Sequence, residues 1–373
     1  MEKKGILERL AQGPVVGDGS MCFILERRGY VRPMLWTPEA VLEHPEAVLQ
    51  LHREYVRAGA DVIQTASYSA NEEKLSYLNS DNVEVAHLTS NINEAACSLA
   101  RKAAEDNNCL ICAGLSPSPE YRENADEVAA RNQFRKQAQI FVEQNVDLLL
   151  AEFFGQIREL EICAEELKKH NKPVAVSMRL GLHGDTNGVS VEECAIRMAK
   201  TGADIIGTNC CFDINTSLKI MEKIKTALDE EGLSPYLMCQ PLGFHCPDAE
   251  SCPMGYTELP EYPFGLEPRS MTRMEVHKFA RAAFDLGVRY IGGCCGFEPH
   301  HIRAIAQELN KERGKPPPVE KIAPAFGKGA SKSAVGGERA SREYWYNLTT
   351  ATGRPYSPAL SKPFVRSDEK RFL

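Results

Sequence analysis

The most constraining feature of the sequence is a unit that recurs along it: an apolar, β-branched run, a loop, and then a charged amphipathic segment. Such runs are typical of strands buried on both faces of a parallel sheet, and eight units over about 300 residues favour a (β/α)8 TIM-type barrel. A doubly wound open sheet is the alternative, but no G-x-G-x-x-G follows the first run. The expected strands are 14–19, 60–67, 109–116, 146–153, 173–180, 203–210, 235–243 and 288–295.

Amphipathic segments between these runs predict the outer helices, among them 45–59, 83–105, 131–145, 191–202 and 273–287. Several of them end in glycine just before the next strand, as a left-handed helix C-cap requires. The first twelve residues, with Ile6, Leu7 and Leu10 among charged residues, predict a further short amphipathic helix.

Composition and charge exclude several classes of protein. The net charge of -7 and the pI near 5.8 argue against a nucleic-acid binder, which needs a basic surface. No run approaches the roughly 18 apolar residues of a membrane span, and the start lacks the apolar segment of a signal peptide. The thirteen cysteines are therefore expected to be thiols or metal ligands in a cytoplasmic protein.

The composition changes near the end of the predicted barrel. Residues 1–312 are expected to form the barrel, and residues 313–373 a linker and C-terminal arm, because Pro, Gly, Ser and Lys dominate after Asn310. Aromatic residues return in the segment 342–364, so the arm is expected to pack on a second subunit or on its own barrel. A homodimer or homotetramer is the expected assembly.

The carboxyl ends of the strands carry the active site in barrels of this kind. The residues at or near these ends are Asp18, Thr65 or Ser67, Ser116, Glu152, Arg179, Asn209 with Cys210, Gln240, and Cys294 with Cys295. Three thiols therefore converge on one face of the predicted barrel. Three thiolates would repel one another unless a cation neutralised them, and sulfur ligands in a reducing compartment favour Zn²⁺. Three protein ligands leave a fourth position open, which is typical of a catalytic zinc site.

Cys294 and Cys295 can face one metal ion only if the backbone turns sharply, because neighbouring side chains on a strand point to opposite faces. Gly292, Gly293 and Gly296 would allow that turn.

The other cysteines favour simpler interpretations. Cys109 and Cys112 have the spacing of a redox motif but fall within a predicted strand, so their thiols are expected to face opposite ways. A second metal site built from Cys239, Cys246 and Cys252 is a weak alternative, because their loop has no closely spaced ligand pair.

Several motifs together resemble the homocysteine S-methyltransferase family, and most closely its betaine and S-methylmethionine branch. They are GDG (17–19), LWTPEAV (35–41), NEAAC (93–97), IIGTNC (205–210), EYPFGLEPR (261–269), GVRYIGGCCGFEPHHIRAIA (287–306), and EYW, GRP and LSKP in the arm. The resemblance implies a zinc barrel that methylates L-homocysteine to methionine, with a C-terminal arm that holds a partner subunit.

The resemblance also assigns residues. Cys210, Cys294 and Cys295 match the zinc ligands of the family. Asp18 and Gly19 match the loop that holds the amino-acid part of homocysteine, and Glu152 matches the carboxylate that receives its ammonium group. Trp36 matches an aromatic residue on the methyl-donor side, and Thr37 and Gln240 are further expected substrate contacts.

The identity of the methyl donor stays open between betaine and S-methylmethionine. A cationic donor would bind over aromatic faces, for which Trp36, Tyr68, Phe153 and Phe154 are candidates. Betaine-using relatives have tyrosine where this chain has Ser69 and Phe153, whereas the S-methylmethionine branch shares the serine. Tyr68 would substitute poorly if it lay on a strand, because a shift of one residue reverses the face.

Two alternatives of another class remain at this point. In the first, a fourth thiol such as Cys211 or Cys239 closes the zinc site and makes it non-catalytic. In the second, the aromatic arm makes the chain an interaction protein on the same barrel.

Overall fold

A computed structural model describes residues 3–32, 36–76, 85–105, 107–315 and 342–347. Within them, eight parallel strands form one sheet in the order β1-β8-β7-β6-β5-β4-β3-β2. They are β1 (Val15–Val16), β2 (Val62–Gln64), β3 (Leu110–Leu115), β4 (Leu148–Phe154), β5 (Val174–Met178), β6 (Ile205–Asp213), β7 (Tyr236–Leu242) and β8 (Val288–Ile291). Each of the eight predicted strands is present.

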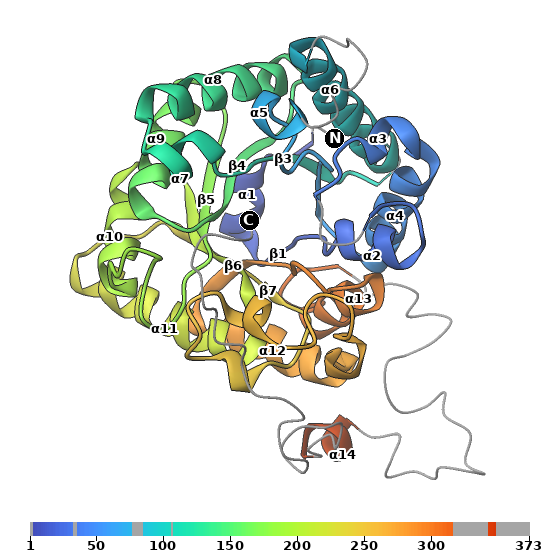
Figure 1. Ribbon diagram of the computed structural model, residues 1–373. Helices are drawn as coiled ribbons and strands as arrows, with labels where there is room; N and C mark the ends of the chain where they lie inside the picture. The colour runs from blue at the N-terminus through green and yellow to red at the C-terminus, as the bar shows by residue number, and fades with distance from the viewer. Residues whose placement is uncertain (1–2, 33–35, 77–84, 106, 316–341, 348–373) are drawn as a thin grey trace.

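The strands form a nearly closed ring, with the helices outside it (Figure 1). The α-helices are α1 (Ile6–Gln12), α2 (Cys22–Arg27), α3 (Ala40–Glu43), α4 (Pro45–Ala58), α5 (Glu72–Leu75), α6 (Val85–Ala104), α7 (Pro119–Asn124), α8 (Glu127–Glu143), α9 (Ile157–Leu167), α10 (Val191–Lys200), α11 (Ile214–Glu230), α12 (Arg273–Leu286), α13 (Pro299–Glu308) and α14 (Arg342–Asn347). The short 3-10 helices among the described residues are η2 (Pro247–Ala249), η3 (Gly255–Glu258) and η4 (Glu267–Arg269). The chain is thus an α/β protein with the predicted TIM-like architecture.

Hydrogen bonds of Asp61 connect the two ends of the sheet. Its backbone N–H donates to the carbonyl oxygen of Val16 at 2.7 Å, and its carboxylate accepts the N–H of Val16 at 2.9 Å. Arg313 also pairs with this carboxylate at 2.9 Å. The first and last strands of the sheet order, β1 and β2, are therefore connected through one buried residue, Asp61.

The interior of the barrel is packed rather than open. Ile6 and Leu10 of α1 join a buried cluster with inward-facing strand residues such as Val62, Leu148 and Tyr290. In Figure 1, α1 accordingly lies across the opening of the ring. The predicted amphipathic helix at the start of the chain thus covers the amino-terminal end of the barrel, which leaves the opposite end for the site.

Several strand ends on that opposite side depart from regular geometry. The register shifts between Ala151 and Phe154 of β4 and between Asn209 and Asp213 of β6. Phe153 and Cys210 have φ angles of 65° and 59°, a left-handed conformation that costs a non-glycine residue of order 1–3 kcal/mol. Such strain is found most often where a side chain must be aimed at a site.

The bounds of β8 differ from the prediction. The strand ends at Ile291, so Cys294 and Cys295 lie on the loop that follows it and not on the strand. The glycines after Ile291 end regular pairing, because they favour a turn over an extended strand.

The C-terminal arm lies mostly outside the described residues, so its predicted role in assembly stays a prediction. Beyond residue 315 the described part of the arm is α14, and it contacts α13 of the barrel. The hydroxyl of Tyr346 donates to Glu308 at 2.8 Å, and Arg342 forms an ion pair with the same carboxylate. No helix among the described residues is long and apolar enough to span a membrane.

Candidate active site

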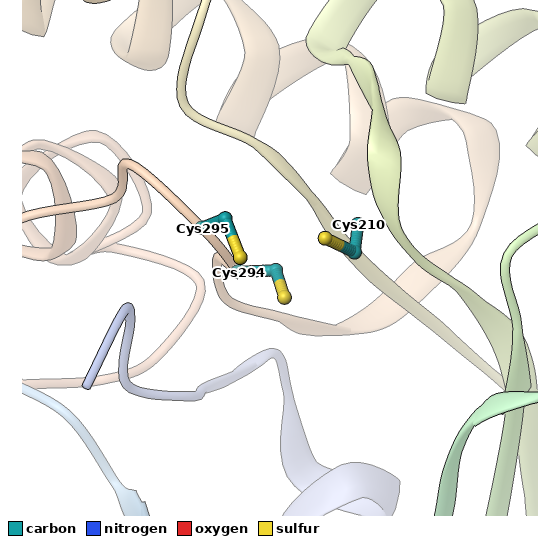
Figure 2. Close-up of side chains that lie close together, drawn as sticks. All are labelled: Cys210, Cys294 and Cys295. Carbon is teal, nitrogen blue, oxygen red and sulfur yellow. The ribbon is translucent and has the colours of Figure 1, made fainter. Parts of the chain in front are cut away.

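Cys210, Cys294 and Cys295 form a cluster at the carboxyl end of the barrel (Figure 2). Cys210 comes from β6 and the other two from the loop after β8, and the three sulfur atoms lie within 4.8 Å of one another. Ligand sulfurs about 2.3 Å from a tetrahedral zinc ion would be about 3.8 Å apart, so the cluster fits Zn²⁺. The described residues contain no other such group of three or more His, Cys, Asp and Glu side chains.

Glycines shape the loop that carries two of these cysteines. Gly296 has a φ of 80°, which a side chain would disfavour, and a Cβ at Gly293 would overlap the ring of Phe297. The N–H of Cys294 donates to the carbonyl oxygen of Pro241 at 2.9 Å. The loop is thus held against β7, with both thiols directed toward Cys210. The predicted sharp turn is confirmed.

The remaining cysteines behave as predicted. All thirteen are free thiols. Cys109 and Cys112 belong to different buried clusters, outside and inside the barrel wall respectively, as alternation along a strand requires. Neither Cys211 nor Cys239 belongs to the three-sulfur cluster. The described structure therefore offers three thiol ligands and no closed four-thiol site.

A cavity of about 880 Å³, counted to its open mouth, adjoins the cysteines. Most of the predicted substrate contacts line it: Asp18, Gly19, Trp36, Thr37, Tyr68, Glu152, Phe153 and Gln240, together with Cys294 and Cys295. These residues lie at the ends of five strands, β1, β2, β4, β7 and β8, or in the segments that follow them. Ser116 and Arg179, which the sequence also places at strand ends, do not line this cavity, and the substrate roles of the residues that do line it stay predictions.

One end of the cavity is acidic. Burial raises the pKa of Asp18 to about 8 and that of Glu152 to about 7, although backbone or side-chain donors partly offset this effect. The Oε1 atom of Gln240 is buried and has no hydrogen-bond partner among the described residues. Two desolvated carboxyl groups and an unused acceptor would all be satisfied by a ligand that carries an ammonium group.

Another part of the cavity wall is aromatic. The ring of Trp36 lies 4.5 Å from that of Tyr68 and 6.2 Å from that of Phe153, and the latter two are 6.0 Å apart. We call these three residues the aromatic trio. Phe154 is fully buried, and its ring centre lies 5.8 Å from that of Phe134. The prediction that Phe154 contacts the donor is therefore not supported. A cationic methyl donor would bind against the trio.

Tyr68 and Ser69 differ from the expectation based on strand alternation. Strand β2 already ends at Gln64, and Ser69 has a φ of 64°, so alternation does not decide where Tyr68 points. Tyr68 lines the cavity, whereas Ser69 is absent from its lining and accepts a hydrogen bond from Lys74 at 3.2 Å. Tyr68 thus lines the cavity, as expected of a candidate for the aromatic cage, and the argument from strand alternation does not apply to it.

Sequence reasoning missed Gln64 as a part of the site. Its side chain donates to the Oε1 atom of Glu152, and its backbone N–H donates to Asp18 Oδ2 at 2.8 Å. It therefore connects the two carboxyl groups. The predicted end of the second strand lay at Thr65 or Ser67, and a strand end placed earlier would have identified Gln64.

Comparison with known proteins identifies the group to which this barrel belongs. Residues 15–309 match the model of the homocysteine S-methyltransferase family. The chain belongs to that family. This family member is 48% identical to mouse betaine–homocysteine S-methyltransferase 1 over 365 residues, which cover 97% of this chain and 89% of the relative. It is also 48% identical to S-methylmethionine–homocysteine S-methyltransferase BHMT2 of Pongo abelii, over 97% of this chain and 98% of the relative.

A solved structure supports the fold of this homocysteine S-methyltransferase. The metallated form of the homocysteine methyltransferase MmuM from Escherichia coli superposes with a TM-score of 0.61 at 20% sequence identity, covering 79% of this chain and 96% of that one. The family assignment and the cysteine cluster together make zinc the cofactor that fits this site.

Proposed function

We propose that the cavity beside the cysteine cluster is where L-homocysteine is methylated to L-methionine, with betaine or S-methylmethionine as the methyl donor. The observation that carries the proposal is the arrangement of one cavity: three clustered thiols, two buried carboxyl groups on one side and three aromatic rings on another. This set matches a thiol amino acid and a cationic methyl donor. The relatives named for betaine and for S-methylmethionine are equally similar to this chain.

Cys210, Cys294 and Cys295 would hold the zinc ion. When bound, zinc would supply the positive charge that keeps a substrate thiol deprotonated near neutral pH, where a free thiol is mostly protonated and a poor nucleophile. The amino-acid end of homocysteine would lie at Asp18, Gly19 and Glu152, with Gln240 Oε1 as a further acceptor. The proposed roles agree with the raised pKa values of both carboxyl groups, because a bound ammonium group would favour their charged forms.

Methyl transfer then requires positioning rather than acid or base chemistry. The new bond forms between the methyl carbon and the homocysteine sulfur, and the old bond to the donor breaks with its electron pair left on the donor atom. The donor thereby loses its positive charge. Trp36, Tyr68 and Phe153 would hold the cation and exclude water, and such positioning is worth up to about 7 to 11 kcal/mol.

The pocket next to the cysteines argues against the two alternatives of another class. A structural zinc site would have a fourth protein ligand, and the described residues add none to the cluster. An interaction protein would not need buried carboxyl groups beside clustered thiols. We further propose assembly into a homodimer or homotetramer through the arm, and a cytoplasmic location, which the free thiols support.

A methionine-forming assay on zinc-loaded protein tests the function. Homocysteine is offered with betaine, with S-methylmethionine or with no donor, and methionine is quantified. Methionine that depends on both zinc and a donor is expected. Zinc-loaded protein that forms no methionine with either donor would contradict the proposal.

A further inference from the structure

A second cavity lies behind the aromatic trio. It measures about 460 Å³, counted to its mouth, and shares Tyr68 and Phe153 with the substrate cavity. The two cavities therefore adjoin at these two side chains, which we call the partition. The second cavity is lined further by Lys74, Arg122, Arg179 and Glu159. We call it the cationic pocket.

Three positive charges face this pocket without a carboxylate partner. Among the described residues, no acidic oxygen forms an ion pair with Lys74, Arg122 or Arg179, whereas Arg158 of α9 pairs with Glu127. Lys74 Nζ donates to Ser69 Oγ at 3.2 Å, and Arg179 Nη1 donates to the sulfur of Met254 at 2.7 Å. Hydroxyl and thioether groups are neutral, so neither hydrogen bond brings a negative charge into the pocket.

The two half-buried cations also lie close to the partition. Lys74 Nζ is 5.9 Å from the ring centre of Tyr68, and the guanidinium carbon of Arg179 is 5.5 Å from that of Phe153. Burial, and then the charge of Arg122, lower the pKa of Lys74 to about 8. A site that disfavours its own positive charges in this way would be stabilised by a bound anion.

One acidic side chain completes the pocket. Glu159 is buried, and its Oε1 atom accepts the N–H of Ser118 at 2.6 Å. Burial raises the pKa of Glu159 to about 7, partly offset by that hydrogen bond and by the charges of Arg122, Arg179 and Lys74. The pocket thus presents an acceptor for an ammonium group beside donors for a carboxylate, which is the pattern that recognises the backbone end of an amino acid.

We propose that the cationic pocket binds the α-carboxylate and α-ammonium groups of a sulfonium amino acid donor, of which S-methylmethionine is the example. Lys74, Arg122 and Arg179 bind the carboxylate, and Glu159 accepts the ammonium group. The sulfonium centre then lies against the aromatic trio, with its methyl group toward the cysteine cluster. This inference rests on the proposed function and selects between its two donors.

The number of methylene groups between the charged groups of each donor explains why the pocket favours S-methylmethionine. In S-methylmethionine, two methylene groups separate the sulfonium from the α-carbon, so its charged end would extend from the trio toward the adjoining cationic pocket. Betaine has a single methylene between its cation and its carboxylate and no ammonium group for Glu159. On transfer, the donor sulfur keeps the electron pair of the broken bond and becomes the neutral thioether of methionine, while the homocysteine sulfur becomes that of a second methionine.

Steady-state kinetics of the zinc-loaded protein test the inference with three donors: S-methylmethionine, (3-aminopropyl)dimethylsulfonium, which lacks the carboxylate, and betaine. The wild type is expected to use S-methylmethionine with a kcat/KM roughly tenfold or more above that of the other two. Lys74→Met and Arg122→Gln should each lower this value roughly tenfold and change that of the carboxylate-free donor by less than about twofold. The KM for homocysteine should stay unchanged.

Two controls separate recognition from a structural role. Lys102→Met removes an exposed lysine of α6 and should change none of these values. Lys74→Arg keeps the positive charge and should retain the use of S-methylmethionine. Equal losses with S-methylmethionine and its carboxylate-free analogue would overturn the inference, as would a wild type that prefers betaine. Both outcomes leave the proposed function standing. Absence of methyl transfer from every donor would instead contradict the proposed function itself, and the inference with it.

Discussion

The side chain of Asn209 accepts the backbone N–H of Phe153 through Oδ1 at a distance of 3.1 Å. The same oxygen accepts the hydroxyl of Ser177 at 2.8 Å. Asn209 directly precedes Cys210, and Phe153 directly follows Glu152. One amide oxygen therefore joins the strand that carries a cysteine of the cluster to the strand that carries both a substrate carboxylate and a ring of the aromatic trio.

Replacing Asn209 by alanine should disturb both halves of the site. Two buried donors would lose their acceptor, which costs about 1–3 kcal/mol in the free energy of unfolding, and the misplaced strand ends should lower kcat roughly tenfold. Denaturant unfolding and methionine formation measure the two effects. Asn209→Asp keeps the acceptor oxygen and should be milder. An alanine variant with normal kcat would show that this bond does not position the site.

Replacing Cys294 by serine should remove zinc and activity together, because a hydroxyl is a much weaker zinc ligand than a thiolate. Zinc per chain, measured by atomic absorption, is the direct readout. Cys211→Ser is the matched control, since Cys211 is also buried and adjoins Cys210 but lies outside the cluster. Stoichiometric zinc in the Cys294 variant would refute its assignment as a ligand.

Replacing Glu152 by alanine should raise the KM for homocysteine by roughly tenfold to a hundredfold, because a charge-assisted hydrogen bond to the substrate ammonium is lost. Gly114→Ala offers a second route to the same result. A Cβ at Gly114 would overlap Glu152 Oε1 and displace the carboxylate without removing it. Initial rates at varied homocysteine give the KM, and an unchanged KM in both variants would dismiss Glu152 as a contact.

Two buried histidines should each lower the free energy of unfolding as the pH falls below about 6.5, whereas Asp18 and Glu152, whose pKa values are raised, contribute in the opposite direction. Burial lowers the pKa of His52 to about 4, and burial together with the charge of His300 lowers that of His301 to about 3. Below pH 6.5 the unfolded chain binds protons that the folded chain does not, so unfolding becomes more favourable until the folded-state pKa is passed.

The His52→Phe variant isolates one of these contributions. Both ring nitrogens of His52 are buried without a hydrogen-bond partner in the described structure, so the variant removes a titrating group and no hydrogen bond. The free energy of unfolding of the variant should decline less than that of the wild type between pH 6.5 and 4. The difference between the two declines should be on the order of 3 kcal/mol over this pH range. Identical slopes for the variant and the wild type would exclude His52 as a source of acid sensitivity.

Removing residues 316–373 should lower the oligomeric state. The cut follows Arg313, whose ion pair with Asp61 belongs to the barrel, so the barrel should stay folded while the arm and its contacts with Glu308 are lost. Sedimentation velocity reports the mass of the assembly, and circular dichroism confirms the fold. If the truncated protein keeps the same number of subunits, the contacts between subunits lie on the barrel and not on the arm.

Local patterns were enough to predict most of the architecture. Each strand was recognisable because burial on both faces of a parallel sheet demands a continuous apolar run, and glycine C-caps marked the ends of α4 and α12. The bounds failed where strands end irregularly. Gly292 and Gly293 after Ile291 allow a turn before Cys294, but they do not fix the last paired residue of β8, since the pairing of neighbouring strands decides where a ladder ends.

The sequence by itself determined the barrel, the family and the three thiols, because residue type, periodicity and order along the chain are enough for these. The tertiary structure alone decided the distances and directions within the site. It brought Gln64 between two carboxyl groups, turned Tyr68 into the cavity beside Trp36, moved Phe154 into the core and left Lys74, Arg122 and Arg179 around a shared pocket. The physical reason is that left-handed residues and register shifts at the strand ends aim these side chains, and both arise from contacts between strands that are distant along the chain.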